Sequence, residues 1–183
     1  MCLLLCTVLM PKFRENLIVT KYKNGYVMIR CMTESDAENI FSIMKQNMQR
    51  YYDARGDNWN EANIQRFFLG MNNALVEHEG KICAFTFYES TPEGAHIHTL
   101  QVVPEHQNRI FGAKLFRWYL SLAEKNGYPE LTCSVFDSNP ALLMYLKVGF
   151  EEVQRDNGIV RLSLSLSKGC YSFRHMASSR KVE

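Results

Sequence analysis

A chain of 183 residues can form one domain with a substantial core, and its 46% hydrophobic content is ordinary for a globular protein. The formal net charge of only +2 argues against a nucleic-acid partner, which would call for a large basic excess. No run of about 18 apolar residues is present, so no membrane helix is expected. The six cysteines form no CxxC pair and no zinc-spaced cluster, so we expect no metal site, and core thiols kept reduced in the cytoplasm.

The ends of the chain are expected to lie outside the fold. Residues 1–10 are apolar but lack the positive charge and the cleavage site of a signal peptide. We therefore expect an N-terminal extension over 1–24, one domain over 25–167 and a loose tail over 168–183, where no periodicity is visible.

The first half of the domain is predicted to hold a strand, two helices and a hairpin. The strand begins near Tyr26, and a helix over 33–50 follows, opened by a capping box of Ser35 and Glu38. A loop over 51–59 precedes a second helix over 60–69. Strands over 73–77 and 81–89 then flank a tight Glu79-Gly80 turn, which is typical of a hairpin.

The stretch AHIHTLQVVPEHQNRIFGA, residues 95–113, joins a strand to a helix through a polar turn. The strand alternates, which predicts one shared face for His96, His98, Leu100 and Val102. Pro104 ends the strand, and Gly112 leads into a helix that ends near Gly127. The apolar stripe of this helix is Phe111, Leu115, Trp118 and Leu122. Backbone N–H groups at such a helix start suit an anion, ideally a phosphate.

The second half is predicted as a strand over 130–136, a helix over 139–148 and a hairpin over 150–154 and 159–166. Asn139 caps the helix and Gly149 follows its end. The order β-α-α-β-β-β-α-β-α-β-β indicates an α/β (α+β) domain with a single mixed, mostly antiparallel, twisted sheet flanked by helices on both faces. An exposed last strand would offer an edge through which two copies could pair as a homodimer.

Two segments carry a family likeness. VVPEHQNRIFGAKL resembles the acetyl-coenzyme A motif of the GNAT acetyltransferase superfamily, Q/R-x-x-G-x-G/A, which Gln107, Gly112 and Ala113 fit. SVFDSNPALLMYLKVGF resembles the second signature of that family, N-x-x-A-x-x-x-Y-x-x-x-G-F. The likeness covers about Tyr26 to Leu166. It implies the GNAT acyltransferase fold and an N-acetyltransferase that moves an acetyl group from acetyl-CoA to a primary amine, on a small molecule or a peptide, by direct attack.

One position departs from the family pattern. Ile110 stands where the family has its first motif glycine, and a β-branched residue resists the positive φ and the close backbone approach that glycine allows. The alternative function is therefore a catalytically silent acyl-CoA-binding or protein-interaction module of the same fold.

The resemblance also assigns residues to the cofactor. The pyrophosphate would lie on backbone amides of the motif loop, and a strand amide before it would contact the pantetheine arm and polarise the thioester carbonyl. The implied cofactor-binding residues are Val102, Val103, Gln107, Asn108, Arg109, Ile110, Phe111, Gly112, Ala113, Lys114 and Asn139. Tyr145 matches the tyrosine that protonates the leaving sulfur. The alternative is that Tyr145 is a core aromatic residue without a catalytic role. For Asn139, capping of the helix would by itself explain the residue equally well.

Two histidines and one loop are candidates for the acceptor side. His96 and His98 are similar to the paired histidines of arylalkylamine N-acetyltransferase, and imidazole is suited to act as a base at neutral pH. His98, which is nearer the cofactor motif, is the first choice for the base. The alternative is that both histidines are half-buried on the strand, with their hydrogen bonds satisfied and no role in proton transfer. The loop over 51–59 would supply acidic side chains to hold an ammonium group, and aromatic rings to form a wall or a cation–π contact. The alternative is that this loop only caps a helix and anchors the core. Its candidate residues are Tyr52, Asp53, Asp57 and Trp59.

Overall fold

The structure is a computed structural model that describes residues 18–22, 25–107 and 110–166. The strands are β1 (Ile18–Tyr22), β2 (Gly25–Arg30), β3 (Asn72–His78), β4 (Lys81–Thr91), β5 (Gly94–Val102), β6 (Glu130–Phe136), β7 (Glu151–Asp156) and β8 (Ile159–Ser165). The helices are α1 (Ala37–Ala54), α2 (Glu61–Phe68), α3 (Phe111–Lys125) and α4 (Ala141–Val148), with 3-10 turns η1 (Glu34–Asp36) and η2 (Pro104–His106). None of the helices in this part of the chain is long and apolar enough to cross a bilayer.

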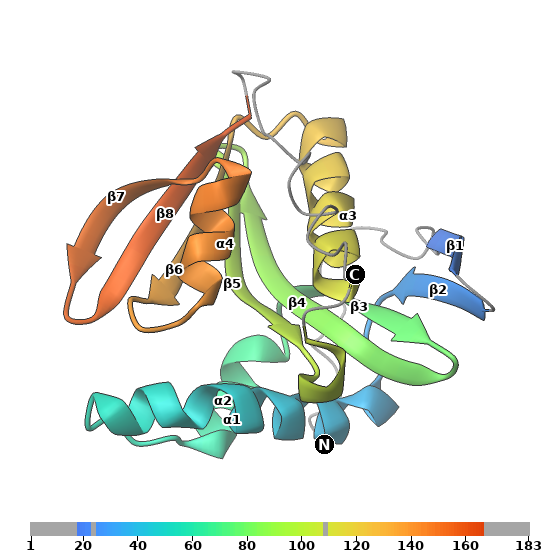
Figure 1. Ribbon diagram of the computed structural model, residues 1–183, viewed down its shortest axis with the longest axis horizontal. Helices are drawn as coiled ribbons and strands as arrows, with labels where there is room; N and C mark the ends of the chain where they lie inside the picture. Colours follow the sequence, from blue (N-terminus) through green and yellow to red (C-terminus); the bar gives the residue numbers. More distant parts are fainter. Residues whose placement is uncertain (1–17, 23–24, 108–109, 167–183) are drawn as a thin grey trace, which may run out of the picture.

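The strands form one sheet in the order β1-β2-β3-β4-β5-β6-β8-β7 (Figure 1). Neighbouring strands are antiparallel except β5 and β6, which run parallel. The predicted mixed, mostly antiparallel sheet is confirmed. The sheet begins before the predicted domain boundary, because β1 lies within the predicted extension over 1–24 and pairs with β2. The rest of that extension, 1–17, and the predicted tail lie outside the described residues.

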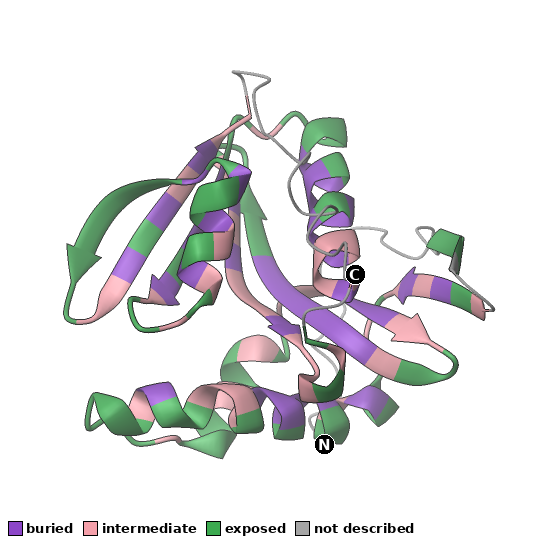
Figure 2. Cartoon of the chain, viewed as in Figure 1, coloured by how far each residue is buried: buried purple, intermediate pink, exposed green. Residues whose placement is uncertain are grey.

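A hydrophobic core lies on each face of the sheet (Figure 2). Strand β3 shows the division, because Ala74 and Val76 join the core under α3 and α4, whereas Leu75 joins the core under α1. The predicted apolar stripe of α3 is buried, as are the inward residues of β8. Helices therefore cover both faces, as the order of elements predicted.

Strands β5 and β6 touch only at their start. Ala95, His96 and Ile97 lie beside Leu131, Thr132 and Cys133, and no pairing follows. Beyond Ile97 the two strands diverge, so the sheet opens between an arm of β1 to β5 and an arm of β6, β8 and β7 (Figure 1). Each arm keeps its own antiparallel ladder, and the facing edges of β5 and β6 are left without a strand partner.

A bulge in β5 lies at the point of divergence. Phe87 of β4 pairs with Thr99 and Tyr88 pairs with Ile97, so His98 is an extra residue opposite no partner. Such a residue interrupts the alternation of side chains between the two faces of the sheet.

The bulge corrects the predicted face of β5. His96 and His98 do lie together, with ring centroids 4.7 Å apart. Leu100 and Val102 instead pack against the core under α3 and α4, on the other face. The prediction that all four share one face is wrong, because strict alternation does not continue through a bulge.

Helix α1 continues one turn beyond its predicted end at Arg50. Tyr51 is buried, and its ring stacks on Phe136 with centroids 5.3 Å apart, so tertiary packing favours the extra turn. The predicted loop over 51–59 is therefore helical up to Ala54. Asn60 caps α2, where its side chain accepts a hydrogen bond from the backbone N–H of Asn63 at 3.0 Å.

The last hairpin places a different strand at the edge of the sheet than the sequence suggested. Asn157 and Gly158 adopt positive φ at the turn between β7 and β8, as a two-residue hairpin loop requires. Because β8 pairs with β6 on its other side, β7 is the edge strand, and it is exposed along its whole length. An edge of charged residues resists pairing with another chain.

A charged network joins the start of α1 to the sheet. Arg30 donates from Nη1 and Nη2 to both carboxylate oxygens of Asp36, at 2.7 and 2.9 Å, and from Nε to Glu77 at 3.0 Å. Asp36 also accepts from the hydroxyl and the N–H of Thr33, which is the observed capping box in place of the predicted one. The hydrogen bonds from Arg30 hold the pKa of Asp36 well below its usual range, although burial opposes this.

Replacing Asp36 with asparagine should lower the free energy of unfolding by about 2 kcal/mol at pH 7, because charge-assisted hydrogen bonds are lost. The folded pKa of Asp36 is lowered, so its stabilisation is complete above the ordinary carboxyl pKa of about 4 and is lost as pH falls through the folded value. Urea unfolding should therefore show a full gap between wild type and variant at pH 7 that shrinks below about pH 4. Glu34→Gln, exposed on the same turn, is the matched control. A gap independent of pH would contradict the prediction.

Candidate active site

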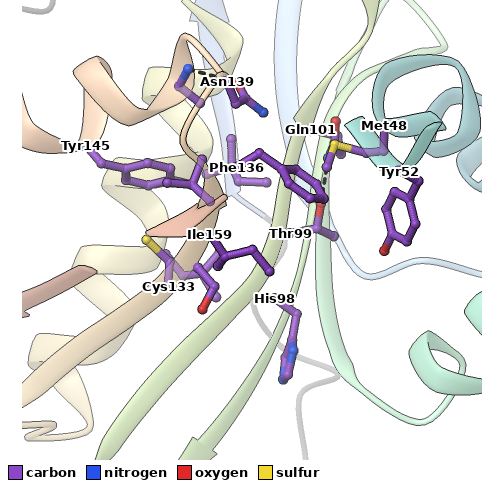
Figure 3. A pocket seen from close by; sticks show the side chains of 15 residues that line it. Met48, Tyr52, His98, Thr99, Gln101, Cys133, Phe136, Asn139, Tyr145 and Ile159 are labelled. Carbon is purple, nitrogen blue, oxygen red and sulfur yellow. Dashed lines mark hydrogen bonds between the residues drawn. The ribbon is translucent and has the colours of Figure 1, made fainter. Parts of the chain in front are cut away.

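A cavity of about 190 Å³ lies where β5 and β6 separate (Figure 3). Side chains from α1, β5, β6, α4 and β8 line it, together with Asn139 at the start of α4. The lining residues are Met48, Tyr52, Ile97, His98, Thr99, Leu100, Gln101, Cys133, Ser134, Val135, Phe136, Asn139, Ala141, Tyr145 and Ile159. Because two diverging strands form its walls, backbone groups as well as side chains are accessible there.

The edge of β5 presents backbone N–H groups to this opening. In an antiparallel ladder, successive N–H groups point alternately to the two sides of the strand. Val103 donates its N–H to the carbonyl of Cys83, at 3.0 Å, on the β4 side. The N–H groups of Leu100 and Val102 therefore point to the other side, where β6 has moved away. Of the two predicted valines, Val102 is placed to contact a ligand, whereas the N–H of Val103 is used within the sheet.

Helix α3 begins beside that edge. A Cβ atom on Gly112 would lie 3.0 Å from Cγ2 of Val102, so the helix start packs on the strand as closely as glycine allows. The first helical bond runs from the N–H of Lys114 to the carbonyl of Ile110, at 2.8 Å. The N–H groups of Gly112 and Ala113 precede it and point out of the helix start, where an anion is favoured.

Ile110 has an ordinary backbone conformation. Its φ of −73° and ψ of −12° lie in the right-handed helical region, and its side chain packs against the core under α3. A β-branched residue adopts this conformation without strain, so a positive φ is not required here. Gln107 is exposed, and its N–H donates to Pro104 at 3.2 Å. Asn108 and Arg109 lie outside the described residues.

Tyr145 projects from α4 into the cavity (Figure 3). Its ring is buried against Phe116 and Phe150, at centroid distances of 6.2 and 5.2 Å. Burial raises the pKa of its phenol well above the usual value, so the hydroxyl holds its proton at neutral pH. The predicted core role and a proton-donating role are thus compatible in one side chain.

Asn139 caps α4 as predicted and also lines the cavity. Its side-chain oxygen accepts from the N–H of Ala141 at 2.9 Å, and its carbonyl accepts from the N–H of Leu142 at 2.9 Å.

Cys133 is a buried thiol, and burial raises its pKa to about 12, so it stays protonated beside Tyr145.

His98 is the histidine that lines the cavity, and it carries a carboxylate partner. Its Nε2 lies 2.9 Å from Oε2 of Glu89 on β4. Two aromatic rings of α2 also meet the imidazole edge-on, Phe67 at 5.3 Å and Phe68 at 6.5 Å between centroids. A carboxylate on one ring nitrogen orients the imidazole and leaves the other nitrogen available for a proton.

His96 has a supporting position. It is absent from the cavity lining, and its Nδ1 lies 2.8 Å from the hydroxyl of Thr132. Burial, and then the neighbouring His98 and Arg161, lower the pKa of His96, so the ring is neutral at pH 7. It packs edge-on against His98, and of the two predicted histidines His98 is the one that lines the cavity.

The residues predicted for the acceptor are separated by the structure. Tyr52 lines the cavity, and Trp59 packs edge-on against it with centroids 5.1 Å apart. Asp53 and Asp57 are exposed and absent from the lining, and Asp57 pairs with Arg55 at 3.0 Å. The aromatic part of the prediction therefore reaches the cavity and the acidic part does not.

Several residues in or beside the cavity were not predicted from the sequence. Phe136 ends β6 and meets Tyr52 edge-on, with centroids 5.7 Å apart. Asn47 of α1 donates to the carbonyl of Val102 at 3.1 Å and to the side chain of Gln101 at 3.0 Å, which ties α1 to the open strand. These contacts join distant segments, and local periodicity carries no signal for them.

Comparison with known proteins bears on this arrangement. The Acetyltransferase (GNAT) family matches residues 35–150 of the chain. The ribosomal-protein-S18-alanine N-acetyltransferase of Escherichia coli is 20% identical, with a TM-score of 0.59 over 76% of this chain and 93% of that one. PaiA N-acetyltransferase of Thermoplasma acidophilum, solved with coenzyme A, is 16% identical, with a TM-score of 0.64 over 76% and 98%.

A third solved structure is YncA of Salmonella typhimurium with its cofactor acetyl-CoA, at 18% identity and a TM-score of 0.53 over 76% of this chain and 94% of that one. At such identities the likeness establishes a common fold. No curated protein matches the sequence. The family match spans more than half of the chain, from before α1 to the end of α4, and the chain belongs to the GNAT acetyltransferase family.

Proposed function

We propose that the protein is an acetyl-CoA-dependent N-acetyltransferase that acts on a primary amine. The observation that carries this proposal is the opening between β5 and β6, whose cavity is lined by β5, His98 and Tyr145, with the start of α3 packed against Val102 of the same strand. Acyl transfer to an amine needs a hydrogen-bond donor for the carbonyl oxygen, a proton donor and a proton acceptor. Backbone N–H groups, a protonated phenol and an imidazole can fill these three roles.

The residues present fit coenzyme A. The start of α3 holds no acidic residue in its first turn, and Gly112 leaves its backbone open beside Val102. We propose that the pyrophosphate lies on N–H groups of the segment Gln107 to Lys114, and that Val102 contacts the pantetheine arm. Lys114, whose Nζ lies 3.3 Å from the hydroxyl of Thr20, adds a positive charge near this end.

Bound acetyl-CoA would supply a thioester, at which attack by an amine forms the amide bond while the carbon–sulfur bond breaks. The N–H of Val102 or Leu100 would donate a hydrogen bond where negative charge develops on the carbonyl oxygen, a contact worth about 3 kcal/mol. His98 would take a proton from the ammonium, because a neutral amine is needed for attack. Tyr145 would hold the proton that the departing sulfur receives.

Two measurements separate this activity from a silent acyl-CoA-binding module. At a coenzyme A concentration of about 100 times Kd, the melting temperature should rise by about 5 °C or more. With acetyl-CoA and a panel of amines, free thiol should be released only when both substrates are present. Stabilisation without release on any amine or peptide would favour the silent module, and no stabilisation would contradict both.

Tyr145→Phe should lower kcat by about 100-fold and leave the Kd for coenzyme A unchanged, because only the proton donor is removed. The matched control is Tyr119→Phe, since Tyr119 is another buried tyrosine and its hydroxyl has no hydrogen-bond partner among the described residues. The rate of thiol release gives kcat, and calorimetric titration with coenzyme A gives Kd. Full activity in Tyr145→Phe would remove the assigned donor.

His98→Ala should lower kcat/KM at pH 7 by about 100-fold, because the proton acceptor is lost. Glu89→Gln retains an oxygen that can accept from Nε2 of His98, so it should keep more activity than Glu89→Ala. Glu93→Gln, on the turn between β4 and β5, is the control. An unchanged kcat/KM in His98→Ala would show that another group is the base.

A further inference from the structure

Strands β6 and β8 present a polar surface beside the cavity. Cys133 of β6 and Leu162 of β8 are cross-strand partners in the core under α3 and α4. Their neighbours Ser134 and Arg161 are also cross-strand partners, and alternation places both on the opposite face, the one on which α1 packs against β3 and β4. Both side chains are exposed, and Ser134 lines the cavity. Arg161 therefore lies directly beside a cavity residue.

Arg161 has no carboxylate partner among the described residues. Arg55 and Arg155, by contrast, pair with Asp57 and Glu152 at 3.0 and 2.6 Å. A guanidinium that is not neutralised by the fold keeps its five N–H donors available for an anion.

The acidic residues of the same arm do not occupy Arg161. Glu130 accepts a hydrogen bond from the hydroxyl of Ser163, and Asp156 accepts one within the turn that follows it. Glu151 lies opposite Ser163 on β7 and forms no ion pair with Arg161. The charge of Arg161 also reaches toward β5, where it adds to burial and to the neighbouring histidine in lowering the pKa of His96.

A second cation lies on the α1 side of the cavity. Arg50 donates from Nη2 to the hydroxyl of Tyr51 at 2.7 Å, and its guanidinium lies over that ring, 4.7 Å from the centroid. The Tyr51 ring stacks in turn on Phe136, which lines the cavity. The carboxylate that contacts a lining residue here, Glu89, is bound to His98. An anionic group on a ligand is therefore favoured over a second ammonium.

The wall formed by β5 adds a hydroxyl that is set to donate. Asn47 donates to Oε1 of Gln101 at 3.0 Å, and Nε2 of Gln101 donates to the hydroxyl oxygen of Thr99 at 2.7 Å (Figure 3). Among the described residues nothing accepts the proton of the Thr99 hydroxyl, and the Ser134 hydroxyl has no hydrogen-bond partner. Both residues line the cavity, so both hydroxyls are available to an oxygen atom of a ligand.

We propose that the acceptor is a small amino acid, whose amine meets His98 and whose carboxylate is bound by Arg161 and Ser134, with the Thr99 hydroxyl donating from the β5 wall. The inference rests on the proposed N-acetyltransferase function and narrows its acceptor. A guanidinium and a carboxylate match in two parallel hydrogen bonds. The cavity of about 190 Å³ is smaller than the roughly 300 Å³ at which sites for drug-sized ligands begin, which favours a small acceptor.

The test compares kcat/KM for thiol release between amino acids and their primary carboxamides, with the full-length protein and acetyl-CoA. Glycine, β-alanine and 4-aminobutanoate differ in the spacing of amine and carboxylate, and each carboxamide keeps the shape without the charge. At least one of the three should exceed its carboxamide by about tenfold. If every carboxamide equals or exceeds its amino acid, or if 1,4-diaminobutane or a lysine-containing peptide exceeds all three, the inference is overturned and the proposed function stands.

Arg161→Gln should reduce the ratio of amino acid to carboxamide to about 1, chiefly by raising KM for the amino acid. Arg161→Lys keeps the charge without the planar fork and should retain an intermediate ratio. Arg155→Gln is the matched control, because Arg155 lies opposite Val160 of the core and hence on the other face of the sheet, and it should leave the ratio unchanged.

Because the same compounds are compared between proteins, differences in the basicity of the amines cancel. Arg161 is exposed, so the fold should tolerate its replacement. An unchanged ratio in Arg161→Gln would overturn the carboxylate site. Absence of thiol release with every amine would instead overturn the proposed function and this inference with it.

Discussion

The separation of β5 from β6 is the constraint on which the rest of the structure depends. A parallel pair that holds over only three residues leaves backbone N–H groups of the β5 edge without a strand partner on β6, where a ligand or water can meet them. The bulge at His98 lies where the strands part, and it turns the two histidines to one face and Leu100 and Val102 to the other. The same irregularity thus divides the proposed cofactor side from the proposed acceptor side.

Close packing of α3 on β5 brings the start of the helix to this open edge. Because Gly112 has no side chain, the helix start can lie against Val102. Ile110 does not disturb this arrangement, since its backbone is ordinary helical and its partly buried side chain packs against the core. The residue that departs from the family motif therefore adopts its conformation without backbone strain.

Burial, rather than charge pairing, sets the protonation of the cavity. Tyr145 and Cys133 both stay protonated because the apolar surroundings disfavour their anions, and His96 stays neutral for the same reason. Among the described residues, the ion pairs of Arg30 with Asp36 and Glu77 lie outside the cavity lining and fasten α1 to the sheet. Helix α1 is in turn tied to the open strand through Asn47, so the network that stabilises the fold also positions the proposed acceptor side.

The sequence by itself determined the order of the elements from β2 onward, the capping of α4, the hairpin turns and the motif residues near the start of α3. These features are local, and their signals are periodicity, glycine and proline positions and capping residues. Only the tertiary structure decided that β5 carries a bulge, that α1 continues through Tyr52, that Asp53 and Asp57 are exposed outside the cavity lining and that Glu89 contacts His98. The reason is physical. Pairing register, ring packing and cross-strand contacts join residues far apart in the chain, and their energies depend on neighbours that no local pattern specifies.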